Sequence, residues 1–408
     1  MPLTRVTPAL QAHVAELEAK GTAKGAEQVV TAVRPGAGER GPRFLLEGQG
    51  EKEFLRMNSN SYLGMGLREE VVRAEEAGSE RYGAGPGAVR FISGSYAPHL
   101  ALETALARFH GREAAMIFSS AYATVMSVLA PLVTADTIVI SDELNHNSII
   151  NAVRLSRPLD KAVYKHLQTA GLEAELEKAA DRAKRVVVVT DGIFSMRGDH
   201  APIDRIMTIA EGWDDRFPEG VIVVMDDSHG VGAFGRTGRG TEEYTASPPV
   251  DVLVGTLGKA FGVNGGYVAS AAAVVRFLRE SSPMYIYSNP ITPGEATAAL
   301  RSLELLDGDA GVELLARLRA LTRRFRDGLL RLGFETLPGE HPVVPLLVRD
   351  TARTRALVRH LFEHGILATG LAYPVVPRVD EEIRFQVNAD HTEADIDYAL
   401  QVLSEFKG

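Results

Sequence analysis

A series of short apolar segments, separated by helical stretches, constrains the fold of this chain more than any other feature. The segments are AAMIFSS, TIVIS, RVVVVTDG, GVIVVMDDSHG and DVLVGTLGK, at residues 114–120, 137–141, 185–192, 220–230 and 251–259. Helical patterns occupy 100–109, 172–184 and 202–213. Apolar strands that alternate with helices are typical of a parallel sheet with both faces buried. The pattern therefore predicts an α/β fold with ligands at the carboxyl ends of the strands.

The pattern of residues along the sequence changes near residue 290. Leu- and Arg-rich helical patterns follow, together with the strand patterns HPVVPLLV and EIRFQVN and a closing helix at 392–406. A chain of 408 residues is longer than one hydrophobic core usually serves. We expect an N-terminal helix and hairpin segment at 1–55, a large domain at 56–290 and a smaller C-terminal α+β domain at 291–408. The first helix is expected at 8–20, with Leu10, Val14 and Leu17 on one face.

Composition excludes several kinds of function. The chain has no cysteine, so disulfides, thiolate metal sites and cysteine nucleophiles are excluded. A net charge of -9 argues against nucleic acid or an anionic membrane as the partner. No apolar run reaches membrane-spanning length, and the N-terminus has no apolar signal-peptide core. The histidines lack HExxH spacing, so we expect no metal site, and we expect a cytoplasmic protein.

Asp226 and His229 follow one of the apolar strands. A turn carboxylate explains most aspartates in such a place, and a single histidine is more often structural than catalytic. In a partly desolvated site, however, a carboxylate can hold a proton on a heteroaromatic nitrogen while a histidine binds a nearby oxygen. The segment alone leaves both interpretations open.

Lys259 lies in the glycine-rich stretch VGTLGKAFGVNGGY, three residues after Thr256. A solvated lysine after a strand is the plainer interpretation. A lysine that forms a Schiff base needs a lowered pKa and a backbone that lets a flat ring approach, and the glycines are expected to provide that approach. An aspartate and then a lysine on successive strands is an arrangement found in enzymes that use pyridoxal phosphate (PLP).

Three further segments place polar groups after strands. In FSSAYATVMSVLAPL, the N–H groups of Ala121 and Tyr122 at a helix start suit an anion, although a plain capped turn explains them equally well. His146 follows another strand, where a neutral imidazole can stack on a ring or serve a structural role. Ser195 lies in a loop, where its hydroxyl either caps a turn or contacts a cofactor.

Taken in order, these motifs resemble those of a known family. They include NSNSYLG, VRFISGSYAPH, FSSAY, DELNHNSII, DGIFSMRGD, DDSHGVGAFGRTGRGTEE, GTLGKAFGVNGGY, YIYSNPITP and GLAYPVVPRVDEEIRFQVNADHT. The set is similar to that of the α-oxoamine synthases, which join an amino acid to an acyl-coenzyme A. The resemblance implies PLP as cofactor and the aspartate aminotransferase-like fold of type I. That fold has a large domain with a mostly parallel sheet and a smaller C-terminal α+β domain.

The resemblance also implies catalytic roles. Lys259 matches the lysine that binds PLP through an imine and, once displaced by the amino acid, takes the α-proton. Asp226 matches the partner of the pyridine nitrogen, and His229 the residue that bonds the ring oxygen. His146 matches the histidine that stacks on the ring.

Further positions match binding residues of the family. Ser195 matches a serine near the cofactor oxygen, and the turn at Ala121 and Tyr122, helped by Thr256, matches the phosphate site. Ser288 and Asn289 resemble a segment that reaches the phosphate from a second subunit, which implies a homodimer with the active site at the subunit interface. Asn60 matches an asparagine near the substrate, and Arg384 matches the arginine that binds the amino acid carboxylate.

The motifs VRFISG, SHGVG, PVVP and IRFQ are most similar to those of glycine C-acetyltransferases. We therefore expect glycine and acetyl-coenzyme A as substrates. The stretch GTLGKAFGVNGGY is more similar to 5-aminolevulinate synthases, and GDHAPI to serine palmitoyltransferases. An 8-amino-7-oxononanoate synthase-like activity is a further alternative. A PLP aminotransferase and a non-catalytic scaffold of the same fold are the competing classes.

Overall fold

The computed structural model describes residues 2–20, 22–23, 25–373, 376 and 379–407, so most of the PVVP motif at 374–377 lies outside the described residues. Contacts divide the chain into two compact units. Unit 1 comprises Met1–Ser59, Leu321–Pro338 and Val343–Gly408, and unit 2 comprises Asn60–Ala320 and Gly339–Pro342. The three-part division at residues 55 and 290 stays a prediction, because contact density describes compactness rather than independent domains.

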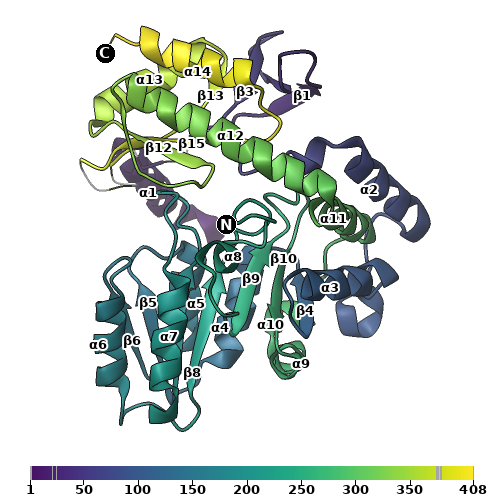
Figure 1. Cartoon of the computed structure of the whole chain (residues 1–408), viewed down its shortest axis with the longest axis vertical. Helices are drawn as coiled ribbons and strands as arrows, with labels where there is room; N and C mark the ends of the chain where they lie inside the picture. Colours follow the sequence, from purple (N-terminus) through teal and green to yellow (C-terminus); the bar gives the residue numbers. More distant parts are fainter. Residues whose placement is uncertain (1, 21, 24, 374–375, 377–378, 408) are drawn as a thin grey trace. The chain divides into compact units, whose positions relative to one another are not determined.

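Unit 2 is built on a seven-stranded sheet with the order β4-β10-β9-β8-β7-β5-β6. The strands are β4 (Ala114–Phe118), β5 (Thr137–Asp142), β6 (Asp160–Tyr164), β7 (Arg185–Asp191), β8 (Val221–Asp226), β9 (Val252–Thr256) and β10 (Gly266–Ser270). Strands β6, β5, β7, β8 and β9 pair in parallel, and β10 pairs antiparallel with both β9 and β4 (Figure 1). The predicted α/β fold with a mostly parallel sheet is confirmed.

The strands of this sheet are apolar because helices cover both of its faces. Val186 and Val188 pack into one buried cluster, with α6 (Thr169–Ala179) and α7 (Ile203–Trp213). Val187 and Val189 pack into the other, with α4 (Ala121–Leu132), α5 (Asn147–Ser156) and α9 (Ala272–Ser281). Successive side chains of a strand point to opposite faces, so a strand that is covered twice must be apolar throughout.

The rest of unit 2 surrounds the sheet edge formed by β4. Helix α11 (Pro293–Leu306) packs against α2 (Glu69–Tyr82) and α3 (Ala97–Phe109). A Thr292–Glu295 capping box begins α11, since each side chain bonds the backbone N–H of the other residue. The short helices are η2 (Met65–Leu67), η3 (Arg90–Gly94), η4 (Asp214–Arg216), α8 (Thr241–Thr245) and α10 (Pro283–Ile286). Helix α12 (Asp309–Arg331) begins in unit 2 and ends in unit 1.

Unit 1 contains two four-stranded sheets, β1-β2-β3-β13 and β11-β12-β15-β14. Their strands are β1 (Val30–Arg34), β2 (Arg43–Leu46), β3 (Glu53–Arg56), β11 (Glu335–Thr336), β12 (Val343–Leu347), β13 (Ile366–Leu367), β14 (Thr369–Leu371) and β15 (Glu382–Gln386). Helices α13 (Thr351–Glu363) and α14 (Glu393–Glu405) complete it. A buried ion pair between Arg43 and Asp395 joins the N-terminal hairpin to α14, so the two ends of the sequence form one unit.

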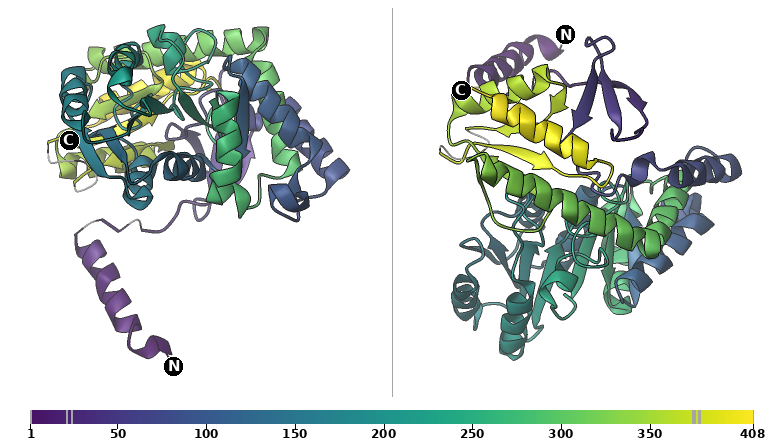
Figure 2. Two further views of the ribbon diagram at one scale, coloured as in Figure 1. Left: turned by 90° about the horizontal axis from the view of Figure 1, so that it is seen from below. Right: turned by 45° about the horizontal axis from the view of Figure 1, so that its top comes forward.

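Helix α1 (Thr7–Ala19) has no buried residue. Leu10 and Val14, predicted to lie on one face of this helix, are 59% and 50% exposed. The left view of Figure 2 shows α1 apart from the rest of its unit. The predicted helix is present, and among the described residues nothing buries its apolar side chains.

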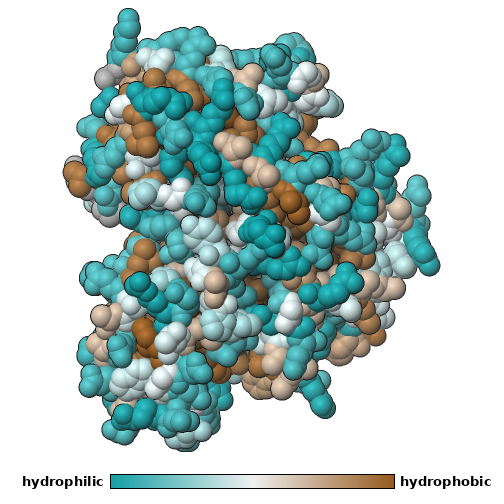
Figure 3. Space-filling model, viewed as in Figure 1, coloured by the Kyte–Doolittle hydropathy of each residue, from teal (hydrophilic) through white to brown (hydrophobic). Residues whose placement is uncertain are grey.

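The surface agrees with the charged composition. On the face shown in Figure 3, hydrophilic residues predominate and apolar residues form small groups. Within the described part of the chain, no helix is long and apolar enough to cross a bilayer. The cytoplasmic location stays a prediction.

Candidate active site

Acidic residues end three neighbouring strands of the seven-stranded sheet. Asp142 ends β5, Asp191 ends β7 and Asp226 ends β8, and the register pairs Asp191 directly with Asp226. On the other side of β8, Asp226 pairs with Val254, two residues before β9 ends at Thr256. The parallel strands thus bring these polar groups to one edge of the sheet, as the sequence predicts.

A cavity with about 360 Å³ of empty space opens at this edge. Its lining residues are Ala121, Tyr122, His146, Ser148, Asp191, Ile193, Ser195, Asp226, Ser228, His229 and Lys259. The structure therefore brings together the predicted lysine, aspartate, both histidines, Ser195 and the start of α4, from segments far apart in the sequence.

Asp191 and Asp226 carry adjacent carboxyl groups that have different hydrogen-bond partners. They are 6% and 7% exposed. Asp226 Oδ1 accepts a hydrogen bond from Ser228 N at 3.1 Å, and Asp191 Oδ2 accepts one from His146 N at 2.8 Å. Burial and then the charge of Asp226 raise the pKa of Asp191 well above its usual range. Asp191 is thus biased toward its neutral form.

His146 caps the N-terminus of α5. Its Nδ1 accepts a hydrogen bond from Ser148 N at 3.2 Å and lies 2.7 Å from Ser148 Oγ. Burial lowers the pKa of His146, and Lys259 adds to this effect while Asp226 opposes it. An Nδ1 that accepts a hydrogen bond leaves the ring proton on Nε2. The site thus holds a neutral imidazole whose ring orientation is fixed by its own helix cap.

His229 is held by residues that the sequence analysis did not single out. Tyr62 Oη lies 2.6 Å from His229 Nδ1, and Tyr62 is fully buried. His341 Nε2 lies 2.9 Å from His229 O, and the rings of Tyr62 and His341 meet edge to face at 5.5 Å. Tyr62 belongs to the NSYLG motif, in which only Asn60 was assigned a role, so the motif was the available signal.

The N-terminus of α4 forms one wall of the cavity. Ser120 caps the helix by accepting a hydrogen bond from Ala123 N at 3.1 Å, and the N–H groups of Ala121 and Tyr122 begin the first turn. N–H groups in the first turn have no partner within the helix and attract anions. A Cβ on Gly266 would lie 2.5 Å from Ala121 N. This glycine of the Lys259 stretch is therefore needed for backbone packing, a reason different from the predicted approach of a ligand.

The strand end that carries Asp226 and His229 is anchored by the next residue, Asp227. Its Oδ2 accepts a hydrogen bond from Thr241 N at 2.7 Å and its Oδ1 one from Thr241 Oγ1 at 2.6 Å. Burial raises the pKa of Asp227 to about 7, although both Thr241 bonds oppose the shift. Gly240 packs on this carboxyl group with a φ of +88°. A Cβ at this position would lie 1.9 Å from Asp227 Oδ2.

We expect Gly240→Ala to lower the free energy of unfolding by about 3 kcal/mol or more, from backbone strain and overpacking together. The matched control is Gly212→Ala in α7, because a Cβ there has no neighbour within 4 Å. Alanine in a helix is favoured over glycine by about 0.5–1 kcal/mol, so the control should be neutral or stabilising. Thermal unfolding of both variants checks the prediction. Equal midpoints would show that Asp227 and Gly240 do not anchor this strand end.

The remaining predicted residues do not line the cavity. Thr256 Oγ1 accepts a hydrogen bond from Gly258 N at 3.1 Å and donates one to Gly265 O at 3.3 Å. Ser288 and Asn289 follow α10 near the surface, and Asn60 lies half-buried in a turn of unit 2. Arg384 belongs to β15 in unit 1, where it pairs with Pro345 and Thr369. Their roles stay predictions.

The cavity also contains groups that sequence reasoning left without a role. These are Ser148, Asp191, Ile193 and Ser228. The buried Oγ of Ser228 has no hydrogen-bond partner within the part of the chain that the structure describes. Among the residues that the structure describes, no group of three or more His, Asp or Glu side chains could hold a metal ion.

Comparisons with known proteins agree with this geometry. Residues 52–403 match the family "aminotransferase class I and II". The 8-amino-7-oxononanoate synthase of Thermosipho melanesiensis is 36% identical over 372 residues, covering 91% of this chain and 92% of that protein. The mitochondrial 2-amino-3-ketobutyrate coenzyme A ligase of Homo sapiens is 35% identical over 405 residues, covering 99% and 92%.

Solved structures show the same fold. A serine palmitoyltransferase from Sphingomonas wittichii superposes with a TM-score of 0.87 at 25% identity, covering 98% of this chain and 97% of that one. The S. paucimobilis enzyme, with a bound PLP–myriocin aldimine, gives 0.86 at 24% identity, covering 97% and 96%. The fold is that of a type I PLP-dependent protein. The chain belongs to the class I and II aminotransferase family, and within it to the α-oxoamine synthases.

Proposed function

We propose that this protein is a PLP-dependent C-acyltransferase that condenses glycine with acetyl-coenzyme A, or cleaves the product in reverse. The observation that carries the proposal is the convergence of Lys259, Asp226, His229 and His146 on one cavity. When bound, PLP supplies an aldehyde that condenses with amines and a ring that takes up negative charge. The polar lining of the cavity, the α4 N-terminus and the buried Ser228 hydroxyl, which has no partner among the described residues, fit such a polar, phosphorylated ring.

The residues of the cavity divide the chemistry among them. Asp226 would hold a proton on the ring nitrogen of the cofactor. Neutral His146 would contact the ring through its imidazole, and His229, held by Tyr62, would bond the ring oxygen. Lys259 would hold the cofactor through its aldehyde, and its Nζ would take the α-proton of the amino acid. The N–H groups of Ala121 and Tyr122 would hold the phosphate.

The names of the relatives define the substrates to compare. The four carbons of 2-amino-3-ketobutyrate divide into two from glycine and two from an acetyl group. In 8-amino-7-oxononanoate, carbons 8 and 9 correspond to alanine without its carboxylate, and carbons 1–7 to a seven-carbon acyl group with a terminal carboxylate. Glycine with an acetyl donor is our proposal, supported by the four motifs and by the match to the human ligase over 99% of the chain. Alanine with the seven-carbon donor is the second candidate, supported by relatives of similar identity.

The test is release of free coenzyme A from acetyl, seven-carbon dicarboxylic and palmitoyl thioesters, each with glycine, alanine or serine. The chain has no cysteine, so it contributes no thiol background. Release that requires glycine and is fastest with the acetyl donor is the expected result, with the product identified by mass. Release with alanine and the seven-carbon donor alone would move the activity to the second candidate.

The competing aminotransferase class gives a different result in the same assay. An aminotransferase converts bound PLP to the pyridoxamine form with amino acid alone and releases no thiol from any donor. A protein that binds PLP and behaves in this way would contradict the proposed acyltransferase.

We also propose that Arg384 binds the carboxylate of the amino acid through its guanidinium fork, on the match of IRFQVN to the family motif. We expect Arg384→Ala to raise the KM for glycine by about 10- to 100-fold, since a hydrogen-bonded charge contributes roughly 1.5–3 kcal/mol. The KM for the acyl donor should change little. Arg349→Ala is the control, because Arg349 is an exposed partner of Glu335. An unchanged glycine KM would remove Arg384 from the carboxylate site.

We propose that a second copy of this chain completes the protein. Phe91 and Ile92 are each 64% exposed and Tyr287 is 79% exposed, an arrangement that usually marks an interface. Tyr287 directly precedes Ser288 and Asn289, the segment proposed to reach the partner's phosphate site. We expect light scattering to give twice the chain mass of 44.0 kDa and Phe91→Glu to weaken that dimer. A monomer with full activity would contradict the shared site.

A further inference from the structure

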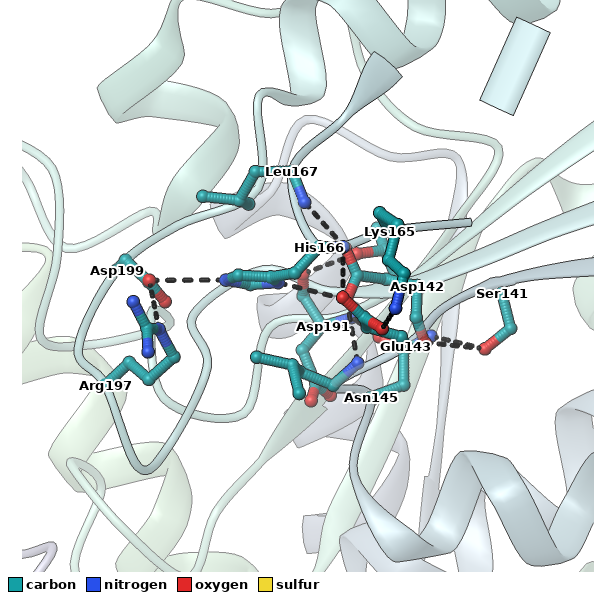
Figure 4. A network of polar contacts seen from close by, with 12 residues as sticks. Ser141, Asp142, Glu143, Asn145, Lys165, His166, Leu167, Asp191, Arg197 and Asp199 are labelled. Atoms are coloured by element: carbon teal, nitrogen blue, oxygen red, sulfur yellow. Dashed lines mark hydrogen bonds and ion pairs between the residues drawn. The ribbon is translucent and has the colours of Figure 1, made fainter. Parts of the chain in front are cut away.

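His166 lies outside the cavity, in a polar network that joins two loops, and each loop carries a cavity residue (Figure 4). The residue follows β6, and its side chain is only 12% exposed. Its Nδ1 lies 3.0 Å from Asp142 Oδ1, and its Nε2 lies 3.2 Å from Asp199 Oδ2. The edge of the ring packs on Phe194, with ring centroids 4.3 Å apart. The imidazole therefore bridges two carboxylates.

This geometry requires a charged ring. An ionised carboxylate can only accept hydrogen bonds, so both ring nitrogens must donate, and only the imidazolium has two N–H groups. Burial acts to lower the pKa of His166, but hydrogen bonds and charges from Asp142 and Asp199 outweigh it and raise the pKa to about 9. The other charged groups nearby are Arg197, which donates to Asp199 at 2.8 Å, Glu143, which accepts from His166 N at 3.0 Å, and Lys165, which pairs with Glu143.

One side of the bridge leads to His146. Asp142 Oδ1 accepts a hydrogen bond from Leu144 N at 2.9 Å, and Asp142 O accepts one from Asn145 N at 3.4 Å. These bonds form the turn that ends at His146, the cap of α5 and a lining residue of the cavity. The position of Asp142 thus determines where this turn sets the imidazole of His146.

The other side leads to Ser195. Asp199 O accepts a hydrogen bond from Phe194 N at 3.0 Å, and Phe194 O accepts one from Gly198 N at 2.8 Å. Residues 194–199 therefore form one closed loop, and Ser195 lies within it and lines the cavity. His166 is bonded to the last residue of this loop.

We propose that His166 is a positioning residue whose imidazolium ties Asp142 to Asp199 and so fixes His146 and Ser195 at the spacing that the cofactor requires. The inference rests on the proposed function for the identity of that cofactor. A neutral ring has one donor, so one nitrogen lone pair would face a carboxylate and repel it. Because the folded-state pKa is raised above the ordinary value of about 6.5, this stabilisation is full below pH 6.5 and is lost as pH rises through about 9.

The test uses His166→Gln, with His364→Gln as control, since His364 is exposed and its ring bonds the backbone carbonyl of His360. The measurement is the dissociation constant of PLP for the apoprotein at pH 7.5 and pH 10. Glutamine has a donor for one carboxylate only, so His166→Gln should bind PLP about tenfold or more weakly at pH 7.5, with little further loss at pH 10. The wild type and the control should bind tightly at pH 7.5 and lose affinity as pH passes 9.

A second variant separates positioning from a merely structural role. In Asp199→Asn, the amide N–H can donate to the neutral ring, so the bridge no longer needs the second proton. We expect this variant to lose less PLP affinity between pH 7.5 and pH 10 than the wild type. Nitrogen NMR of ¹⁵N-histidine-labelled protein, with His166→Gln for assignment, should show the ring protonated at both nitrogens at pH 7.5.

Each outcome decides the proposal. The proposal is overturned if His166→Gln binds PLP as tightly as the wild type at both pH values, or if the His166 ring titrates near pH 6.5. If His166→Gln does not fold, the pH profile of Asp199→Asn decides alone, and a profile identical to wild type counts against the bridge. If the wild type binds no PLP at all, the proposed function fails instead, and the ring titration still decides whether the doubly bonded imidazolium exists.

Discussion

Replacing Lys259 with alanine is expected to reduce coenzyme A release on the order of 10³-fold or more. Proton transfer by a positioned side chain contributes roughly 10²–10⁴-fold, and this variant also removes the amine that we propose to hold the cofactor. Lys259 is half-buried and lies in the cavity with Asp226 and His146. Thiol release under saturating substrates measures the effect, and added ethylamine should restore part of the rate by supplying a free base.

The matched control for this variant is Lys184→Ala. Lys184 is 58% exposed and pairs with Asp136 at 2.7 Å, and it directly precedes β7, at the opposite end of that strand from the cavity residue Asp191. Its removal should leave the rate and the unfolding midpoint unchanged. A Lys259→Ala protein that is folded and turns over at the wild-type rate would show that another group takes the α-proton.

The exchange of Asp226 for asparagine is expected to reduce the rate by about 10²–10³-fold. Removing one preorganised electrostatic partner of a developing charge has effects of this size. Asparagine keeps the shape and can still accept the hydrogen bond from Ser228 N, so the change removes the negative charge with little rearrangement. The rate of coenzyme A release is again the measurement, with PLP content determined in the same samples.

Asp191→Asn provides the internal comparison for Asp226→Asn. The two aspartates are paired across β7 and β8 and are almost equally buried. Burial and the charge of Asp226 already favour the neutral form of Asp191, and an asparagine oxygen can still accept the hydrogen bond from His146 N. We expect a loss below about tenfold. Equal losses in the two variants would contradict the separate role proposed for Asp226.

The sequence predicted the parts of the fold that depend on local pattern. Strands β5, β7, β8 and β9 are apolar throughout because both faces are covered, and each ends at or near its predicted polar residue. The antiparallel strand β10 was not distinguished from the glycine-rich stretch that leads into it, since GYVAS is short and begins with a glycine. Helix α1 was predicted from its periodicity, but periodicity shows a face and does not supply what covers it, and α1 has no buried residue.

The residues of the candidate site also divide into those that the sequence predicted and those that it did not. Residues next to a strand end, such as Asp226, His146 and Lys259, were found from position and resemblance together. Tyr62 was missed because its contact with His229 joins residues 167 apart in the sequence. His166 was missed because YKHLQT contains no pattern, and its two partners are brought to it only by the tertiary structure. Long-range pairing of single side chains leaves no periodic trace in a sequence.

Strand β10 has a consequence for how this scaffold can change. Gly266 pairs with Phe118 on one side and with Thr256 on the other, so the ends of β4 and β9 stand level across one intervening strand. Backbone ladders therefore set the separation between the turn at Ala121 and the segment that carries Lys259, whatever side chains surround them. The loops beyond the sheet are free of this constraint. Selection for a longer or shorter acyl donor can thus act on those loops and leave the two segments proposed to hold the cofactor in register.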